Sequence, residues 1–179
     1  MHSFNDLNIN KSWTLFLDRD GVINKRLMDD YVKNINEFEF LPDVPEAIAK
    51  LTKIFGKIFV VTNQRGIARE LMTVEDLLLI NDFMLKKIRE AGGRIDKVYF
   101  CPHDRHENCG CRKPAPGMAY QAQEEFPCID FSRSIMVGDT QSDIDFGQNA
   151  GMFTVHITPE DIRGIRADSL ADFTKMITG

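Results

Sequence analysis

Short runs of apolar residues, each followed at once by polar ones, recur along this chain and constrain its fold more than any other feature. The runs are rich in β-branched and aromatic side chains, as expected of strands that are buried on both faces. Longer segments with helical spacing of apolar residues separate the runs. Strands that alternate with helices predict a mainly parallel, doubly wound α/β sheet with helices on both faces. The predicted strands are Trp13–Asp18, Lys57–Asn63, Lys97–Cys101, Ser134–Asp139 and Met152–Ile157.

Two of the predicted helices carry clear start signals. One covers Asp43–Gly56, with its first residue as the N-cap and its last residue closing the end. Another begins at Thr73, where Asp76 three residues on makes a variant of the capping box. The apolar face of this second helix is predicted to be Val74, Leu77, Leu78, Leu85 and Ile88, interrupted by Asn81. The remaining predicted helices are Pro116–Glu125, Asp143–Ala150 and Ser169–Ile177.

Length and charge narrow the classes of function. The chain has 179 residues, which predicts a single domain over 1–179, and a formal net charge of −5, which disfavours nucleic acid and anionic membranes as partners. The first twelve residues lack the apolar run of a signal peptide, and Ile58–Val61 falls far short of the ~20 residues that span a bilayer. We expect a cytoplasmic monomer, in which lasting disulfides are disfavoured and the cysteines need another explanation.

Acidic residues directly follow two of the predicted strands. Asp18 and Asp20 end the first strand, and Asp139 and Asp143 follow the fourth. Because ligands bind beyond the carboxyl ends of strands in open α/β sheets, these four carboxylates should share one edge. They repel one another unless a cation neutralises them, and such an oxygen-rich site suits Mg²⁺. The Asp-x-Asp spacing lets one carboxylate attack while the other moves a proton. The alternative is that these acids cap helices or lie in solvated turns.

The stretch CPHDRHENCGCRKP combines thiols and imidazoles in one polar loop. Three thiolates and one imidazole match a closed tetrahedral zinc site, and bound metal would replace the apolar core that this loop lacks. His106 is a rival for the imidazole ligand, although Pro102 stiffens the segment before His103. The cysteines could also form a disulfide, stay as inert free thiols or hold a catalytic zinc ion. The candidate zinc ligands are Cys101, His103, Cys109 and Cys111.

Two cations, Arg112 and Lys113, follow the last of these cysteines at once. An Arg-Lys pair alone is most simply a solvated basic turn. Here the backbone before it would be clamped by the metal, and a cation fixed in place serves a phosphate better than a mobile one. Arg112 can also fork onto a phosphate or a sugar hydroxyl.

The motifs DRDGVIN, VVTNQRGIAR, CPHDRHENCGCRKPAPGM and MVGDTQSDI, taken in this order, resemble the haloacid dehalogenase superfamily of phosphatases. The resemblance covers roughly Leu15 to Gly151. It implies a Rossmann-like fold without a large cap domain, a zinc-bound loop, and a Mg²⁺-dependent phosphatase that acts on a small phosphosugar. The motif sequences are most similar to the branch that removes the 7-phosphate from a heptose bisphosphate. The alternative within the superfamily is a histidinol-phosphate phosphatase.

The resemblance also implies catalytic roles for four residues. Asp18 would attack phosphorus and form an aspartyl-phosphate. Asp20 would protonate the leaving sugar oxygen and then deprotonate the hydrolytic water. Thr62 would hydrogen-bond a phosphoryl oxygen, and Lys113 would neutralise the phosphoryl group and Asp18.

The same resemblance implies the binding residues. Mg²⁺ would be held by the Asp18 carboxylate, the Asp20 backbone carbonyl and Asp139, with Asp143 orienting its water ligands. Substrate contacts would come from Lys113 together with Asn63 and Arg112. Arg65 departs from the family pattern, since relatives often carry a small residue there, and it is expected either to contact substrate or to face solvent.

The chain departs from the family pattern at Thr140, where relatives often carry Lys, and in the loop Lys25–Tyr31, which is longer than in some relatives. Both features leave the fine specificity open. A phospho-accepting receiver domain is the non-enzyme alternative, since it also binds Mg²⁺ and carries phosphate on Asp. The spacing disfavours it, because a receiver has an adjacent acidic pair and an acceptor on a later strand.

Overall fold

A computed structural model of the chain describes residues 7–160 and 164–179. Its centre is a sheet of six parallel strands in the order β3-β2-β1-β4-β5-β6. This is the strand order of doubly wound nucleotide-binding folds, and it differs from the 2-1-3-4-5 order that receiver domains share with flavodoxin. The predicted fold class is therefore confirmed and the receiver alternative is excluded. The strands are β1 (Thr14–Leu17), β2 (Lys57–Asn63), β3 (Lys97–Cys101), β4 (Ser134–Gly138), β5 (Phe153–Ile157) and β6 (Ile165–Ala167).

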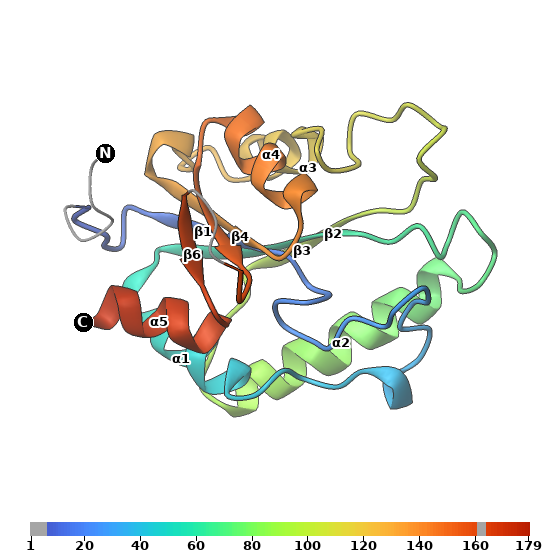
Figure 1. Cartoon of the computed structure of the whole chain (residues 1–179), viewed down its shortest axis with the longest axis horizontal. Helices are drawn as coiled ribbons and strands as arrows, with labels where there is room; N and C mark the ends of the chain where they lie inside the picture. The colour runs from blue at the N-terminus through green and yellow to red at the C-terminus, as the bar shows by residue number, and fades with distance from the viewer. Residues whose placement is uncertain (1–6, 161–163) are drawn as a thin grey trace.

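Helices cover both faces of the sheet, as Figure 1 shows. One face carries α1 (Val44–Ile54), α2 (Val74–Glu90) and α5 (Leu170–Thr178), and the other carries α3 (Gly117–Glu125) and α4 (Gln141–Ala150). Strand β1 shows how the two faces are filled, because Leu15 and Leu17 pack in the first core and Phe16 in the second. This alternation of side chains explains why a parallel strand between two helical layers is apolar throughout. Short 3₁₀ turns lie at Ile35–Glu37 and Phe131–Arg133.

Three details differ from the sequence predictions. The edge strand β6 is absent from those predictions, because three residues with a central Arg166 give no recognisable strand pattern. Asp43 precedes α1 in a left-handed conformation (φ 59°), and its side chain makes no capping hydrogen bond. In α2 the residues Val74 and Leu78 are exposed, so the predicted apolar face is wrong there.

The start of α2 agrees with the prediction, since the Thr73–Asp76 capping box is present. The buried side of this helix includes Leu77, Ile80, Met84 and Ile88, together with the polar Asn81. Asn81 accepts a hydrogen bond from the buried Arg19, so the interruption of the apolar stripe provides a partner for a buried charge.

Among the described residues, no helix is both long and apolar enough to cross a membrane. The signal-peptide prediction rests partly on residues 1–6, which lie outside the described residues.

Candidate functional site

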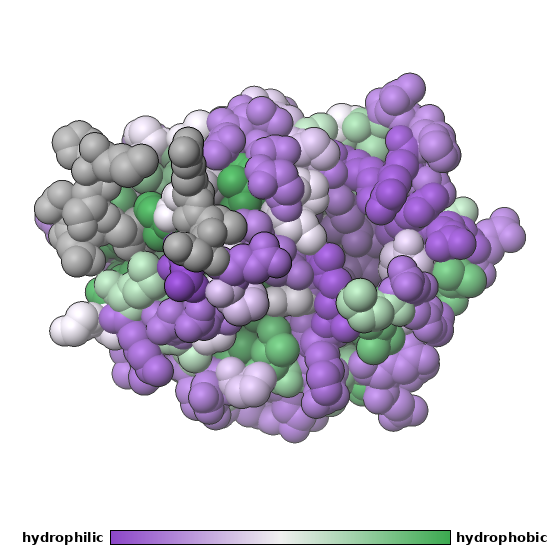
Figure 2. Space-filling model, in the orientation of Figure 1, coloured by the Kyte–Doolittle hydropathy of each residue, from purple (hydrophilic) through white to green (hydrophobic). Residues whose placement is uncertain are grey.

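The carboxyl ends of the central strands open onto a cavity of about 590 Å³. Asp18 directly follows β1, Thr62 and Asn63 end β2, and Asp139 directly follows β4. The chain changes sides of the sheet between β1 and β4, which is where ligands bind in open α/β folds. Figure 2 shows hydrophilic side chains gathered around a hollow on this side of the molecule. The predicted meeting of these polar residues at one edge is thus seen in the structure.

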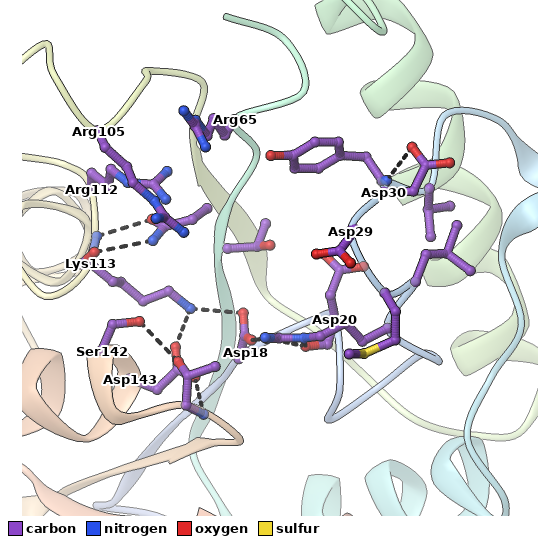
Figure 3. A pocket seen from close by; sticks show the side chains of 18 of the residues that line it. Asp18, Asp20, Asp29, Asp30, Arg65, Arg105, Arg112, Lys113, Ser142 and Asp143 are labelled. Carbon is purple, nitrogen blue, oxygen red and sulfur yellow. Dashed lines mark hydrogen bonds and ion pairs between the residues drawn. The ribbon is translucent and has the colours of Figure 1, made fainter. Parts of the chain in front are cut away.

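Lys113 lies between two of the acids. Its ammonium group donates to Asp18 Oδ1 at 2.7 Å and to the Val61 carbonyl at 2.8 Å, and it pairs with Asp143 Oδ1 at 2.6 Å. Figure 3 shows the Lys113 side chain reaching down toward both carboxylates. The Lys113 side chain is only 2% exposed, so this ion pair is shielded from water. All three protons of the ammonium group are used, which fixes its position beside Asp18.

The charges of this triad depend on one another. Burial and the nearby Asp143 raise the pKa of Asp18 to about 7, against the opposing effect of Lys113. Burial also disfavours the charged form of Lys113, but Asp18 and Asp143 outweigh it and hold the pKa of Lys113 above its ordinary value. For Asp143 the attraction of Lys113 and hydrogen bonds from Thr140 exceed the effect of burial and lower its pKa. The arrangement therefore needs a permanent cation at Lys113.

Two glycines allow the backbone to pass close to the carboxylates of Asp139 and Asp143. Gly21 has φ +99°, and a Cβ there would lie 2.0 Å from Asp139 Oδ2. A Cβ at Gly138 would lie 2.1 Å from the Cβ of Asp143. Asp143 also takes part in the capping box at the start of α4, where its Oδ2 accepts from the Thr140 N–H at 3.0 Å. It is therefore both a helix-capping residue and a member of the acidic cluster.

Asp20 belongs to a separate hydrogen-bond network. Its carboxylate accepts from Arg19 at 3.1 Å, from Asn24 at 2.9 Å and from Gln64 at 2.9 Å. Gln64 also donates to Thr62 Oγ1 at 2.9 Å, which links the two predicted catalytic residues. Burial alone would raise the pKa of Asp20, but the Arg19 guanidinium and these hydrogen bonds hold it below its usual value.

Arg26 places a guanidinium group among the remaining oxygen atoms. Its Nη2 donates to the Asp20 carbonyl and to Asp139 Oδ1, both at 2.9 Å, and lies 3.7 Å from Asp18 Oδ2. Burial and repulsion by Asp143 raise the pKa of Asp139 to about 6, although Arg26 acts in the opposite direction. These oxygens thus form a site that favours a positive charge.

The donor set at this position fits a magnesium ion. Oxygens of Asp18, Asp139 and Asp143 lie within 4.8 Å of one another. The Asp20 carbonyl lies beside them, because Arg26 Nη2 contacts both this carbonyl and Asp139 Oδ1 at 2.9 Å. Carboxylate and carbonyl oxygens are the ligands that Mg²⁺ takes in proteins.

The cysteine–histidine loop brings its four candidate ligands together. Cys111 Sγ lies 2.8 Å from Cys101 Sγ and 3.2 Å from His103 Nδ1, and Cys101 Sγ lies 3.5 Å from Cys109 Sγ. These separations exceed the ~2.05 Å of a disulfide bond, and all four cysteines are free thiols. Four ligand atoms within 4.8 Å of one another fit the closed Cys₃His type of structural zinc site. His106 has no place in this cluster.

Asn63 fixes the backbone of Lys113. Its Oδ1 accepts from the Lys113 N–H at 3.0 Å, and its Nδ2 donates to the Lys113 carbonyl at 3.2 Å. Asn63 also lines the cavity, so its contact with substrate stays a prediction beside this role in holding Lys113.

Several arginines line the cavity, and Arg65, Arg105 and Arg112 lie on the side above Lys113 (Figure 3). Arg65 pairs with Asp104 at 2.9 Å, and Arg112 donates to the His103 carbonyl at 3.4 Å. Arg105 is exposed and also lines the cavity. On the opposite side, Asp29 and Asp30 come from the loop Lys25–Tyr31.

Several residues of this site escape prediction from the sequence. Arg19 and Gln64 stand inside the motifs DRDG and TNQ, so the motifs contain the signal, but only the fold shows that they hold Asp20. Arg26 lies in the loop that is expected to affect specificity, and Arg105 lies in the cysteine-rich loop. Nothing in the residue pattern indicates that Arg26 reaches the acids.

Comparison with known proteins gives one consistent family. A family model described as HAD-hydrolase-like matches residues 110–163. The D-glycero-alpha-D-manno-heptose-1,7-bisphosphate 7-phosphatase of Mycobacterium bovis is 38% identical over 89% of this chain and 84% of the relative. The corresponding beta enzyme of Photorhabdus laumondii is 35% identical over 92% of this chain and 95% of the relative.

Solved structures agree with the sequence relatives. The D,D-heptose 1,7-bisphosphate phosphatase of B. bronchiseptica, complexed with magnesium and phosphate, has a TM-score of 0.84 and 29% identity, covering 93% of this chain and 98% of that chain. The enzyme of the same name from Burkholderia thailandensis has a TM-score of 0.67 and 27% identity, covering 93% and 99%.

Proposed function

The chain belongs to the haloacid dehalogenase-like hydrolases and is a phosphatase of that family, and from this premise we propose that it removes the 7-phosphate from D-glycero-D-manno-heptose 1,7-bisphosphate. The names of its relatives cover both anomers of this substrate, and the proposal includes both.

The observation that carries the proposal is that one cavity has positive charge at two places: at Lys113 and at a cluster of arginines. Lys113 lies beside Asp18 at the catalytic end, while Arg65, Arg105 and Arg112 lie further along the same cavity. A sugar with a phosphate at each end offers one dianion to each group. Guanidinium groups are well suited to bind the phosphate that is not cleaved, because they can donate two parallel hydrogen bonds to it.

In the proposed reaction Asp18 attacks the phosphorus atom of the 7-phosphate, and the bond from phosphorus to the sugar oxygen breaks. Lys113 neutralises the charge on Asp18 and on the phosphoryl oxygens, so the two anions can approach each other. The hydroxyl of Thr62, at the end of β2, donates a hydrogen bond to a phosphoryl oxygen. Water then attacks the aspartyl-phosphate and releases inorganic phosphate.

Asp20 carries the proton in both steps. The resting network of Arg19, Asn24 and Gln64 keeps its carboxylate ionised, which suits the base that activates the hydrolytic water. An incoming phosphate dianion disfavours a second negative charge close by, so substrate binding raises the pKa of Asp20 and lets it take up the proton for the leaving oxygen.

Asp18, Asp139 and the Asp20 carbonyl would hold Mg²⁺, with Asp143 positioning Lys113 and the water ligands. Bound Mg²⁺ supplies positive charge to the transferring phosphoryl group.

Zinc on Cys101, His103, Cys109 and Cys111 has a structural role in this proposal. Lys113 follows Cys111 by two residues, so a metal-ordered loop and the Asn63 clamp both define where its backbone lies. We further propose that the whole chain, 1–179, forms one monomeric phosphatase domain that acts in the cytoplasm, where free thiols persist.

The rival substrate is histidinol phosphate. Its amine would suit Asp29 and Asp30, which line the cavity, but it brings no second phosphate to the arginines.

The test is phosphate release from a panel: both heptose 1,7-bisphosphate anomers, heptose 7-phosphate, histidinol phosphate and fructose 1,6-bisphosphate. At least one heptose bisphosphate should have the highest kcat/KM. Arg105→Gln should raise KM for that bisphosphate by roughly tenfold, as expected for loss of a charge-assisted hydrogen bond, and leave KM for heptose 7-phosphate unchanged. A higher kcat/KM for histidinol phosphate would refute heptose bisphosphate as the substrate. Equal effects of Arg105→Gln on both sugars would refute the argument that the arginines bind the second phosphate.

A further inference from the structure

Arg26 lies against the oxygens that we assign to magnesium. Its backbone follows Asn24, which is anchored by bridges to Asp20 and to Phe40, and the N–H of Lys25 donates to the Glu39 carbonyl at 2.8 Å. The guanidinium of Arg26 donates to the Asp20 carbonyl through Nη2 at 2.9 Å and through Nε at 3.3 Å. Its Nη2 also donates to Asp139 Oδ1 at 2.9 Å.

Arg26 contacts or lies close to each of the three proposed metal ligands. The Asp20 carbonyl and Asp139 accept hydrogen bonds from Arg26, and Asp18 Oδ2 lies 3.7 Å from its Nη2. A guanidinium and Mg²⁺ both need the lone pairs of these oxygens, and Mg²⁺ demands ligands at about 2.0–2.1 Å. The two cations therefore exclude each other at this position.

We propose that Arg26 is a built-in competitor for the divalent cation, so that the metal binds only when the guanidinium leaves these oxygens. The proposal rests on the magnesium site described above and not on the identity of the sugar. The Arg26 side chain is 40% exposed, so it can turn out of the site into the cavity and remain solvated.

Two features distinguish Arg26 from Lys113, the other cation near Asp18. Lys113 is buried and bonds Asp18 Oδ1 and Asp143 Oδ1, which leaves Asp18 Oδ2 on the side of Arg26. Lys113 therefore accompanies the metal, whereas Arg26 takes its place. Lys25, next to Arg26 on the same loop, pairs instead with Glu39 at 3.2 Å on the surface.

The test measures Mn²⁺ binding to the full chain by electron paramagnetic resonance, in the absence of substrate. Arg26→Gln should bind Mn²⁺ roughly tenfold more tightly than the wild-type chain, because a charge-assisted bond no longer has to be broken first. Lys25→Gln is the matched control, since it removes one positive charge from the same loop without touching the metal ligands, and its affinity should stay within about twofold of wild type. Equal or weaker binding by Arg26→Gln would overturn the proposal. Binding by neither protein would refute the metal site itself.

Thermal unfolding provides a second readout that needs no catalysis. A ligand stabilises the folded state more when it binds more tightly, so a fixed concentration of Mg²⁺ should raise the Tm of Arg26→Gln more than that of wild type. A Tm increase no larger than that of wild type would contradict the competition.

Discussion

Replacement of Asn63 by Ala tests how Lys113 is placed for catalysis. The Asn63 side chain makes two hydrogen bonds to the backbone of Lys113, at 3.0 Å to its N–H and at 3.2 Å to its carbonyl. Ala cannot make either bond. The ammonium group would still bond Asp18 and Asp143, but its backbone would lose the contact that joins the loop to the end of β2.

The size of the effect follows from these contacts. A neutral hydrogen bond contributes about 1 kcal/mol net, so the pair is worth about 2 kcal/mol. If this energy is used to align Lys113 in the transition state, kcat should fall by roughly tenfold to thirtyfold, with KM little changed.

Steady-state phosphate release measures both constants. Asn149→Ala is the control, because Asn149 Nδ2 donates to the Pro114 carbonyl at 3.0 Å, one residue beyond Lys113. It removes a similar bond to the same loop and should leave kcat within about twofold of wild type, as expected for an exposed surface contact. A kcat for Asn63→Ala that equals that of Asn149→Ala would refute the reasoning, and so would a loss confined to KM.

The other predictions concern the nucleophile, the zinc loop and the turn after β1. Asp18→Asn should bind substrate but lower kcat by at least roughly a thousandfold, since the nucleophile is lost; a kcat near wild type would rule out this assignment. Metal analysis of chain purified without chelators should find about one zinc ion per chain, and Cys109→Ser should lose both the ion and turnover; retained turnover without zinc would break the link to Lys113. Gly21→Ala should lower the free energy of unfolding by roughly 2 kcal/mol or more, because its Cβ would collide with Asp139; calorimetry showing an unchanged Tm would contradict this.

The fold is predictable from the sequence because each central strand is buried on both faces and therefore reads as an unbroken apolar run. The carboxyl ends of such strands have to meet at one edge, which is why the residue pattern alone groups Asp18, Thr62 and Asp139 correctly. The three-residue edge strand β6 has no comparable signal, since only one of its residues is buried.

Helix faces are harder to predict. Val74 and Leu78 have the spacing of a buried stripe, yet they are exposed, while the polar Asn81 is buried. The reason lies in tertiary structure, because Asn81 pairs with the buried Arg19 of the DRDG motif. Periodicity alone contains no information on such a long-range partner.

The fine structure of the site also lies beyond the motifs. The charges of Asp18 and Lys113 depend on partners that lie far apart in the chain. Asp20 is held by its sequence neighbours Arg19 and Asn24 together with the distant Gln64. Arg26 is the clearest case, since its contacts with Asp20 and Asp139 depend on the path of a loop that no residue pattern defines.

The most direct test of the account is to trap the covalent intermediate. Excess enzyme is mixed with heptose 1,7-bisphosphate and Mg²⁺, quenched in acid within milliseconds, reduced with borohydride and analysed by peptide mass spectrometry. An aspartyl-phosphate on Asp18 predicts homoserine at position 18, and its absence in the Asp18→Asn protein. Phosphate release in the same samples with an unmodified Asp18, or with the label on another residue, would contradict the account.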